Sequence, residues 1–237
     1  VAPPDIRYNL VMPASIIAEG KLSNLQLEAI VYGSQRHMED VPIATSDGND
    51  AMSDVKAPVA SRCGFLLGDS AGMGKGRTLA GFVVENISRG RKKHVWISVS
   101  NDLYQDALRD LQDLGMGKMY TKTCFNLSKF KVQDTINCDE GIIFVTYSML
   151  VAKGRLEQLL EWCRGDEGED QFDGLICLDE CHKAKAIVLD GDGNAKKGSS
   201  QTAAKVVELQ KRLPRARVVY CSATSVSEPK NLGFMNR

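Results

Sequence analysis

Residues 64–78 read GFLLGDSAGMGKGRT, and this stretch decides the fold. Its apolar start, FLL, is typical of a buried parallel strand, and the small residues that follow lead into a helix. The polar and glycine positions match the order D-x-x-G-x-G-K, a phosphate loop with aspartate in place of the usual first glycine: Asp69, Gly72, Gly74 and Lys75. The sequence therefore predicts a strand, a phosphate-binding loop and a helix in direct succession.

A loop of this composition can bind a polyphosphate for physical reasons. Glycines let consecutive backbone N–H groups turn toward one centre, and the following helix contributes the positive end of its dipole. Lys75 adds a full charge for the β and γ phosphates. We therefore expect a polyphosphate ligand to contact the whole segment: Asp69, Ser70, Ala71, Gly72, Met73, Gly74, Lys75, Gly76 and Arg77. On this stretch alone, a glycine-rich turn without a ligand remains the alternative.

Gly76 departs from the general pattern of phosphate loops. The residue after the lysine is usually Ser or Thr, whose hydroxyl binds the magnesium ion. Thr78, the next hydroxyl, is two residues further on and would point elsewhere. If water takes the place of the absent hydroxyl, the substitution Gly76→Ser should be tolerated.

Length and composition bound the rest of the prediction. The chain has 237 residues, 43% of them hydrophobic, which fits one α/β domain at residues 63–237 behind an N-terminal arm, helix and loop at residues 1–62. Lys and Arg total 30, as do Asp and Glu, so a global basic signature for nucleic acid is absent, although a local basic groove is not excluded. The ends are abrupt, which suggests a piece of a longer chain.

The cysteines and the hydropathy suggest a compartment. Seven cysteines without a C-x-x-C pair are typical of reduced, mostly buried thiols in an intracellular protein. No run approaches the roughly 20 apolar residues of a membrane span, and the first residues are unlike a signal peptide. We therefore expect a soluble protein without a membrane partner.

Hydrophobic patterning predicts alternating strands and helices. Apolar runs predict strands at 65–67, 94–100, 141–146, 174–179 and 217–221, and helical spacing predicts helices at 22–38, 79–88, 101–115, 153–163 and 201–213. Residues 1–13 are expected to be an extended arm, 38–61 a loop, and 116–140 irregular with one short strand at most. Near-continuous apolar strands between helices indicate a mostly parallel sheet with helices on both faces. The carboxyl ends of such strands share one edge, where the phosphate loop lies.

Gln26 lies in the first predicted helix, ahead of the phosphate loop. Its amide offers a donor and an acceptor together, which is the pattern needed to contact adenine. A glutamine on a solvated helix face is the other interpretation, and the two stay open here.

Asp179 and Glu180 directly follow the apolar strand residues LICL. A carboxylate pair at the tip of a strand is suited to nucleotide hydrolysis, with Asp179 holding Mg²⁺, through water, and Glu180 polarising the attacking water. Capping of a following helix is the alternative, and the upstream phosphate loop makes it the weaker one. His182 completes Asp-Glu-Cys-His, and two hydroxyls follow the last strand: Ser222 and Thr224.

Two patterns resemble metal sites without completing them. Asp190, Asp192 and Asn194 match the start of a calcium loop, but Ala195 replaces its glycine and Gln201 its closing glutamate. The two cysteines beside the carboxylates have no further Cys or His at ligand spacing, so zinc is not expected.

Taken in order, Q … DxxGxGK … DECH … SAT resembles the motifs of superfamily 2 helicases and translocases, which line one face of a RecA-like domain. The segments GDSAGMGKGR, WISVSNDL, FVTYSML, LDECHKAK and SATSVSEPKN are similar to the strawberry notch family, nuclear regulators of transcription related to chromatin remodellers. The resemblance covers nearly the whole chain. The family usually has GKGR, which makes Gly76 a family trait.

The resemblance implies roles for residues already noted. Gln26 would contact adenine, Lys75 the phosphates and Asp179 the magnesium, with Glu180 as catalytic base. Three residues would couple the nucleotide state to nucleic acid or to a partner domain: His182, Ser222 and Thr224. Four residues fall where such domains touch a nucleic-acid backbone, although polar strand ends are an equally good interpretation: Ser100, Asn101, Thr146 and Tyr147.

By this resemblance the chain is the first RecA-like domain of an ATPase that couples ATP hydrolysis to movement on DNA or chromatin, in the nucleus and in transcription regulation. Transcription-factor proteins are possible partners. A second RecA-like domain is missing from the chain, so the isolated domain should be nearly inactive. The alternative is a nucleotide-dependent switch or scaffold that binds ATP and protein partners without translocating.

Overall fold

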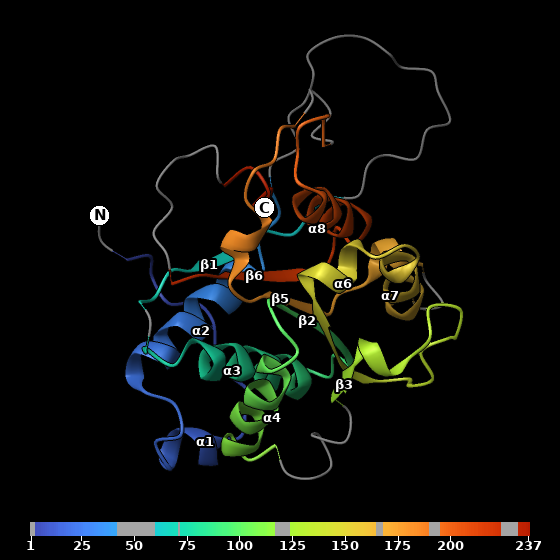
Figure 1. Ribbon diagram of the computed structural model, residues 1–237. Coiled ribbons are helices and arrows are strands. Elements are labelled where there is room, and N and C mark those ends of the chain that lie inside the picture. Colours follow the sequence, from blue (N-terminus) through green and yellow to red (C-terminus); the bar gives the residue numbers. More distant parts are fainter. Residues whose placement is uncertain are drawn as a thin grey trace.

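The computed structural model describes residues 3–41, 60–70, 72–116, 124–164, 168–189, 195–223 and 232–237. Its centre is a parallel sheet of six strands in the order β1-β6-β5-β2-β4-β3 (Figure 1). The strands are β1 Phe65–Leu67, β2 Lys93–Ser98, β3 Cys124–Asn126, β4 Gly141–Thr146, β5 Leu175–Leu178 and β6 Arg217–Cys221. The five predicted strands are confirmed, and β3 is the short strand allowed for in the irregular region.

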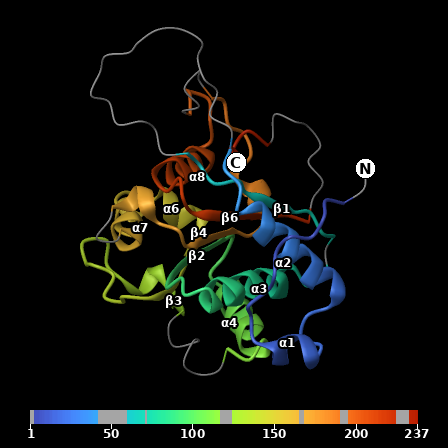
Figure 2. The ribbon, with the colours of Figure 1, turned by 180° about the vertical axis from the view of Figure 1, so that it is seen from behind.

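Helices cover both faces of the sheet, as Figures 1 and 2 show from opposite sides. On one face lie α2 Asn24–Arg36, α3 Lys75–Ser88 and α4 Leu103–Asp113, with the short α1 Ala14–Ala18 below them. On the other lie α6 Tyr147–Val151, α7 Arg155–Cys163 and α8 Gln201–Arg212. The 3-10 turns are η1 Leu127–Lys129, η2 Glu169–Gln171 and η3 Cys181–Ala184. This is the α/β architecture that the patterning predicts.

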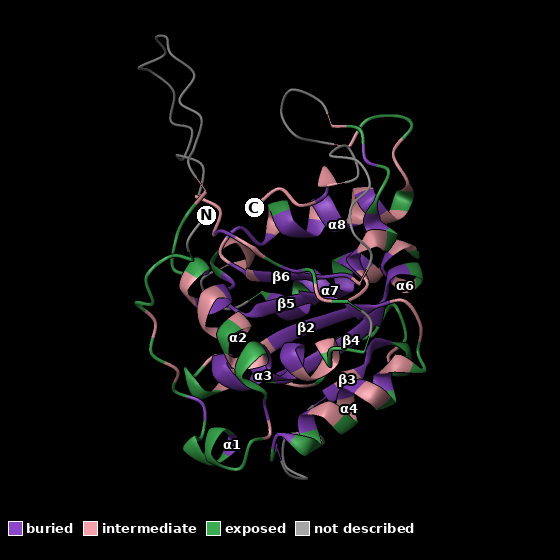
Figure 3. Cartoon of the chain, turned by 90° about the vertical axis from the view of Figure 1, so that its left-hand side faces the viewer, coloured by how far each residue is buried: buried purple, intermediate pink, exposed green. Residues whose placement is uncertain are grey.

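The inner strands of the sheet are mostly apolar because both of their faces are buried, as Figure 3 shows. Successive side chains of a strand point to opposite faces of the sheet. In β2, Val95 and Ile97 join the core under α6, α7 and α8, whereas Trp96 joins the core under α3 and α4. The sheet thus separates two hydrophobic cores. The loops at its edges are available for binding and catalysis.

The N-terminal segment is tied to the sheet domain through Glu85, which is fully buried in α3. Its carboxylate accepts from the hydroxyl of Tyr8 at 2.7 Å and from the backbone N–H groups of Val11 and Met12, both at 2.9 Å. Met12 itself is buried in the core shared with α3. The segment before α2 therefore packs against the domain along its length.

Two short helices differ from the sequence expectations. α1 lies where no helix is predicted, and α6 begins directly after β4, where the side chain of Thr146 accepts from the backbone N–H of Met149 at 3.2 Å. Helices of five residues have too little length to show a period, so tertiary contacts decide them. Among the described residues, no helix is long and apolar enough to cross a membrane.

Candidate nucleotide-binding site

The phosphate loop, residues 68–74, joins β1 to α3 at the carboxyl edge of the sheet. Gly72 and Gly74 have φ angles of 84° and 75°, a left-handed conformation that L side chains rarely adopt. Gly74 occupies the N-cap position of α3, which has no side-chain cap. The loop therefore leaves the positive end of α3 available to an anion.

Lys75, the first residue of α3, folds back over the loop. Its Nζ donates a hydrogen bond to the backbone oxygen of Ser70 at 3.1 Å. A flexible ammonium group held by one carbonyl can exchange this partner for a phosphate oxygen at little cost, because the phosphate carries full charge. Ala71, which the sequence also assigns to the loop, lies outside the described residues.

Gln26 fixes the first turn of α2 and touches the phosphate loop. Its side-chain oxygen accepts from the N–H of Ser23 at 2.9 Å, and the Ser23 hydroxyl accepts from the N–H of Gln26 at 3.3 Å, which is a capping box. Its amide nitrogen donates to the backbone oxygen of Gly74 at 3.1 Å. Gln26 thus braces the loop, and its contact with adenine stays a prediction.

Asp179 lies directly after β5, on the same sheet edge. Its backbone N–H donates to Ile97 at 2.8 Å, and its backbone oxygen accepts from the Tyr147 hydroxyl at 2.9 Å. Its carboxylate accepts from the hydroxyl of Ser98 at 2.8 Å. Burial raises the pKa of Asp179, while the Ser98 hydrogen bond and the charge of Lys75 lower it. Lys75 is therefore close enough for its charge to stabilise the ionised carboxylate of Asp179.

Ser98 is the site residue that the sequence reasoning missed. It is the last residue of β2, which pairs with β5, so its hydroxyl meets the residue that follows the neighbouring strand. The signal was a lone serine closing an apolar run. Only knowledge of which strands are neighbours would have shown its partner.

Glu180, His182 and Ser222 form a connected group beside the carboxylate strand. Nδ1 of His182 lies 3.3 Å from Glu180 Oε2 and 3.2 Å from Ser222 Oγ. Glu180 has a φ of 48°, a left-handed conformation that costs a non-glycine residue energy. The backbone N–H of Ser222 donates to Leu67, the last residue of β1, at 3.1 Å. Ser222, after β6, thus links the strand of the phosphate loop to the carboxylate pair.

The four residues expected to contact nucleic acid have unequal exposure. Asn101 is exposed and accepts from the Asn126 amide at 3.1 Å, and Ser100 is half-buried. Thr146 and Tyr147 are buried, and both are used by the scaffold, as the cap of α6 and as the donor to Asp179. Contact with nucleic acid stays a prediction for all four. Thr224 and the residues of the rejected calcium loop, 190–194, lie outside the described residues.

Packing against α4 gives a reason for glycine at position 76. A Cβ at Gly76 would approach Asp110 Oδ2 to 2.4 Å, which is too close for any real Cβ. Asp110 is held from the other side by Arg77, whose Nε lies 3.9 Å from its carboxylate. The tolerance of Gly76→Ser expected from the sequence therefore requires the carboxylate of Asp110 to move first.

The donor set fits magnesium and a nucleoside triphosphate. The phosphate loop has a left-handed turn that a side chain would fill, since a Cβ at Gly74 would come within 2.7 Å of the Gln26 amide nitrogen. Asp179 offers a carboxylate oriented by Ser98, and oxygen is the ligand that Mg²⁺ prefers. The residues of this edge thus match both groups chemically.

Comparisons with known proteins agree with this geometry. A family profile described as "P-loop containing NTP hydrolase pore-1" matches residues 1–237. Protein strawberry notch of Drosophila melanogaster is 46% identical over 248 residues, which cover 100% of this chain and 14% of the fly protein. Protein strawberry notch homolog 2 of Homo sapiens is 45% identical over 245 residues, covering 100% and 15%. The solved structure of the DUF1998 helicase MrfA bound to DNA and AMPPNP has a TM-score of 0.56 at 14% identity, covering 100% of this chain and 29% of that one.

Fold and site together define a class: the chain is a P-loop NTPase domain, and its fold is that of the RecA-like domains in solved helicase structures such as MrfA. More particularly, it belongs to the P-loop NTP hydrolase family of the matching profile, and it is a homologue of the strawberry notch proteins along its whole length. The chain spans 14% and 15% of the two relatives named.

Proposed function

We propose that this chain binds and hydrolyses ATP as the first motor domain of a DNA-directed, helicase-like ATPase. The observation that carries the proposal is the convergence of Lys75, Asp179 and Glu180 on one sheet edge. Ser222 connects them, since it bonds to the strand of the phosphate loop and to the histidine beside Glu180. This edge is where ligands bind in open parallel sheets.

In the proposed mechanism each residue has a distinct task. The phosphate loop and Lys75 bind and orient the triphosphate, and Asp179 holds the magnesium, through water. The magnesium ion, when bound, neutralises charge on the phosphate oxygens. Glu180 accepts the proton of the attacking water at its carboxylate. His182, whose Nδ1 lies beside the Glu180 carboxylate and is hydrogen-bonded to Ser222, positions that carboxylate and relays its state to the end of β6.

DNA, chromatin, a second RecA-like domain and transcription-factor proteins are proposed as partners, with a nuclear location. The support is the relation to strawberry notch proteins and the solved structure of MrfA with DNA and AMPPNP. In enzymes of this type an arginine from another domain stabilises the transition state and contributes about 10³–10⁵ in rate. This chain alone should therefore bind ATP and hydrolyse it barely above background.

The state of Arg77 favours keeping a second candidate, an ATP-dependent switch or scaffold. Arg77 is ion-paired with Asp113 and lies near Asp110, so it is engaged with α4. A site whose catalytic arginine must come from another domain can also bind ATP without hydrolysing it, and ATP binding alone can then change which proteins the domain contacts.

Phosphate release by a protein that carries this chain and the second domain decides between the two. With duplex DNA added, the motor predicts ATP turnover that rises with DNA. Glu180→Gln should keep ATP binding and should lower the turnover rate about 10²–10⁴-fold, because an amide cannot accept the proton. A switch predicts that the unaltered protein and the Glu180→Gln variant both bind ATP and that neither hydrolyses it. Normal turnover in Glu180→Gln would remove Glu180 from the mechanism.

A further inference from the structure

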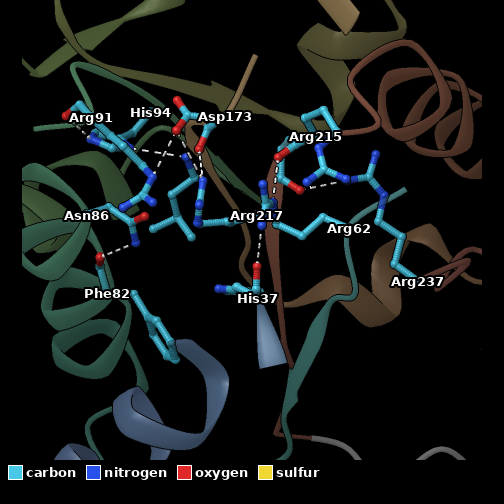
Figure 4. Close-up of polar contacts among 12 residues, drawn as sticks. His37, Arg62, Phe82, Asn86, Arg91, His94, Asp173, Arg215, Arg217 and Arg237 are labelled. Atoms are coloured by element: carbon cyan, nitrogen blue, oxygen red, sulfur yellow. Dashed lines mark hydrogen bonds and ion pairs between the residues drawn. The ribbon is translucent and has the colours of Figure 1, made fainter. Parts of the chain in front are cut away.

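A second polar site lies at the opposite edge of the sheet, where the strands begin. Figure 4 shows arginines from separate segments meeting there: Arg62 before β1, Arg91 before β2 and Arg217 at the start of β6. Together with Arg89, Ser34 and His37 they line a cavity of about 260 Å³. One water needs roughly 10–15 Å³ on such a measure, so the cavity has room for a hydrated ion. The proposed ATPase mechanism uses none of these residues.

The arginines outnumber the carboxylates that face them. Arg89 pairs with Glu85 at 3.1 Å, and Arg91 and Arg217 share Asp173 at 3.2 and 3.5 Å. Within the described part of the chain, the guanidinium of Arg62 donates to two backbone oxygens, those of His37 at 2.6 Å and Arg215 at 3.0 Å. Asp40 also acts on Arg62, but it is paired with Arg215 at 2.7 Å. Five guanidinium groups thus meet three carboxylates, which leaves an excess of positive charge.

The excess positive charge contributes to lower pKa values of the arginines themselves. Burial, followed by the charges of Arg91 and Arg62, lowers the pKa of Arg217 to about 9. Burial and the charge of Arg215 lower the pKa of Arg62 in the same way. Cations that destabilise one another in a partly buried cavity are stabilised when an anion binds between them.

Two residues of the cavity lining carry a buried polar atom without a hydrogen-bond partner among the described residues, Ser34 at its hydroxyl and His37 at its ring. Of these two atoms, only that of His37 is an acceptor alone, since a hydroxyl can also donate. His37 is 1% exposed, and its Nε2 lies 3.0 Å from the backbone oxygen of Val218, so Nε2 carries the proton. Nδ1 is then an acceptor, and it has no hydrogen-bond partner among the described residues. The other buried histidine of this edge, His94, has both nitrogens engaged, by Arg91 and by Leu175. A buried acceptor without a donor is costly, and a ligand hydroxyl would satisfy it.

We propose that this cavity binds a phosphate-type oxyanion that keeps one P–OH group, as inorganic phosphate does at neutral pH. The arginines donate to its charged oxygens, and Nδ1 of His37 accepts its hydroxyl hydrogen. Charge-assisted hydrogen bonds from guanidinium groups are among the strongest that proteins make. Sulfate has the same shape and charge and lacks the hydroxyl, so the site should distinguish the two ions.

The test uses the Lys75→Ala chain, because the phosphate loop would otherwise bind phosphate as well. Calorimetric titrations at pH 7.5 and constant ionic strength compare inorganic phosphate, sulfate and phenyl phosphate, a monoester that is mostly without P–OH at this pH. Phosphate should bind at least about 10-fold more tightly than either, since one hydrogen bond to a charged group is worth that much. Equal affinities for the three ions would remove His37 from the site.

Two arginine variants in the same background locate the binding. Arg91→Gln should weaken phosphate binding at least about 10-fold by removing a charged donor. Arg109→Gln, which removes the same charge from a pair with Asp106 on α4, should leave phosphate binding unchanged. Equal effects of the two, or no phosphate binding in the Lys75→Ala chain, would overturn the proposal. In case Arg91→Gln unfolds, phosphate should also shift the amide NMR signals of His37 and Arg91 in the chain with its arginines intact, and unshifted signals count against the site.

Discussion

Asp179 keeps its position through contacts from two neighbouring segments, β2 and α6, and Ser98 of β2 supplies the one to its carboxylate. A hydroxyl that donates to a carboxylate stabilises the charged form and fixes the direction of its free lone pairs. The magnesium role proposed for Asp179 therefore depends on a residue of β2, which β3 and β4 separate from β5 in sequence order. Single hydrogen bonds thus decide the position and the charge of the Asp179 carboxylate.

Ser98→Ala tests that dependence. The substitution should raise the pKa of Asp179 further, since burial then acts without the opposing hydrogen bond, and should cost about 1–2 kcal/mol of unfolding free energy. The magnesium concentration needed for half-maximal ATP binding should rise with it. Carboxyl NMR titration and a magnesium series measure the two effects. Ser88→Ala, an exposed serine at the end of α3, is the matched control, and identical behaviour of the two variants would contradict the role of Ser98.

Gly76 of α3 faces the side chain of Asp110 on α4. The helix could gain from a better helix former at this position, by up to about 1 kcal/mol, but the carboxylate of Asp110 occupies the space of a Cβ. The glycine after the phosphate-loop lysine thus leaves room for the Asp110 carboxylate between the two helices.

Gly76→Ser should lower the unfolding free energy by about 1 kcal/mol, because overpacking outweighs the gain in helix propensity. The double variant Gly76→Ser/Asp110→Ala removes the obstructing carboxylate and should recover that loss relative to Asp110→Ala alone. Urea denaturation of the four proteins gives the coupling energy directly. A serine that costs the same stability in both backgrounds would show that Asp110 is not the obstacle.

These helices and strands illustrate what patterning can predict. The apolar runs predicted β1, β4 and β6 with their observed bounds. In β4, which is buried on both faces, nearly every residue carries the signal. The phosphate loop and the carboxylate pair were predicted by residue type and spacing. The short helices α1 and α6, the Ser98 hydrogen bond and the contact of Gly76 with Asp110 were not, since each depends on which distant segments pack together.

For the molecule as a whole, two buried histidines couple folding to pH. Burial lowers the pKa of His37 to about 3 and that of His94 to about 4, both below the ordinary 6.5. Below pH 6.5 the unfolded chain binds protons that the folded chain does not. Stability from these residues is therefore complete above pH 6.5 and is lost as pH falls toward 4.

The unfolding free energy should fall by up to about 1.4 kcal/mol per pH unit for each histidine in that range. Urea denaturation at pH 7 and pH 5 measures the loss, and imidazole NMR signals of the folded chain assign it. Both histidines should remain neutral at pH 5. Protonation of either in the folded chain near pH 6.5 would contradict the account.

The central claim is that the edge formed by the phosphate loop and the carboxylate strand is an ATP site. Titration of a fluorescent ATP analogue into this chain, with magnesium present, tests it most directly. The unaltered chain should bind, Lys75→Ala should bind at least about 10-fold more weakly for want of a full charge against the triphosphate, and Lys153→Ala, an exposed lysine before α7, should bind normally. Equal affinity of the unaltered chain and Lys75→Ala would mean that the loop is only a turn between β1 and α3.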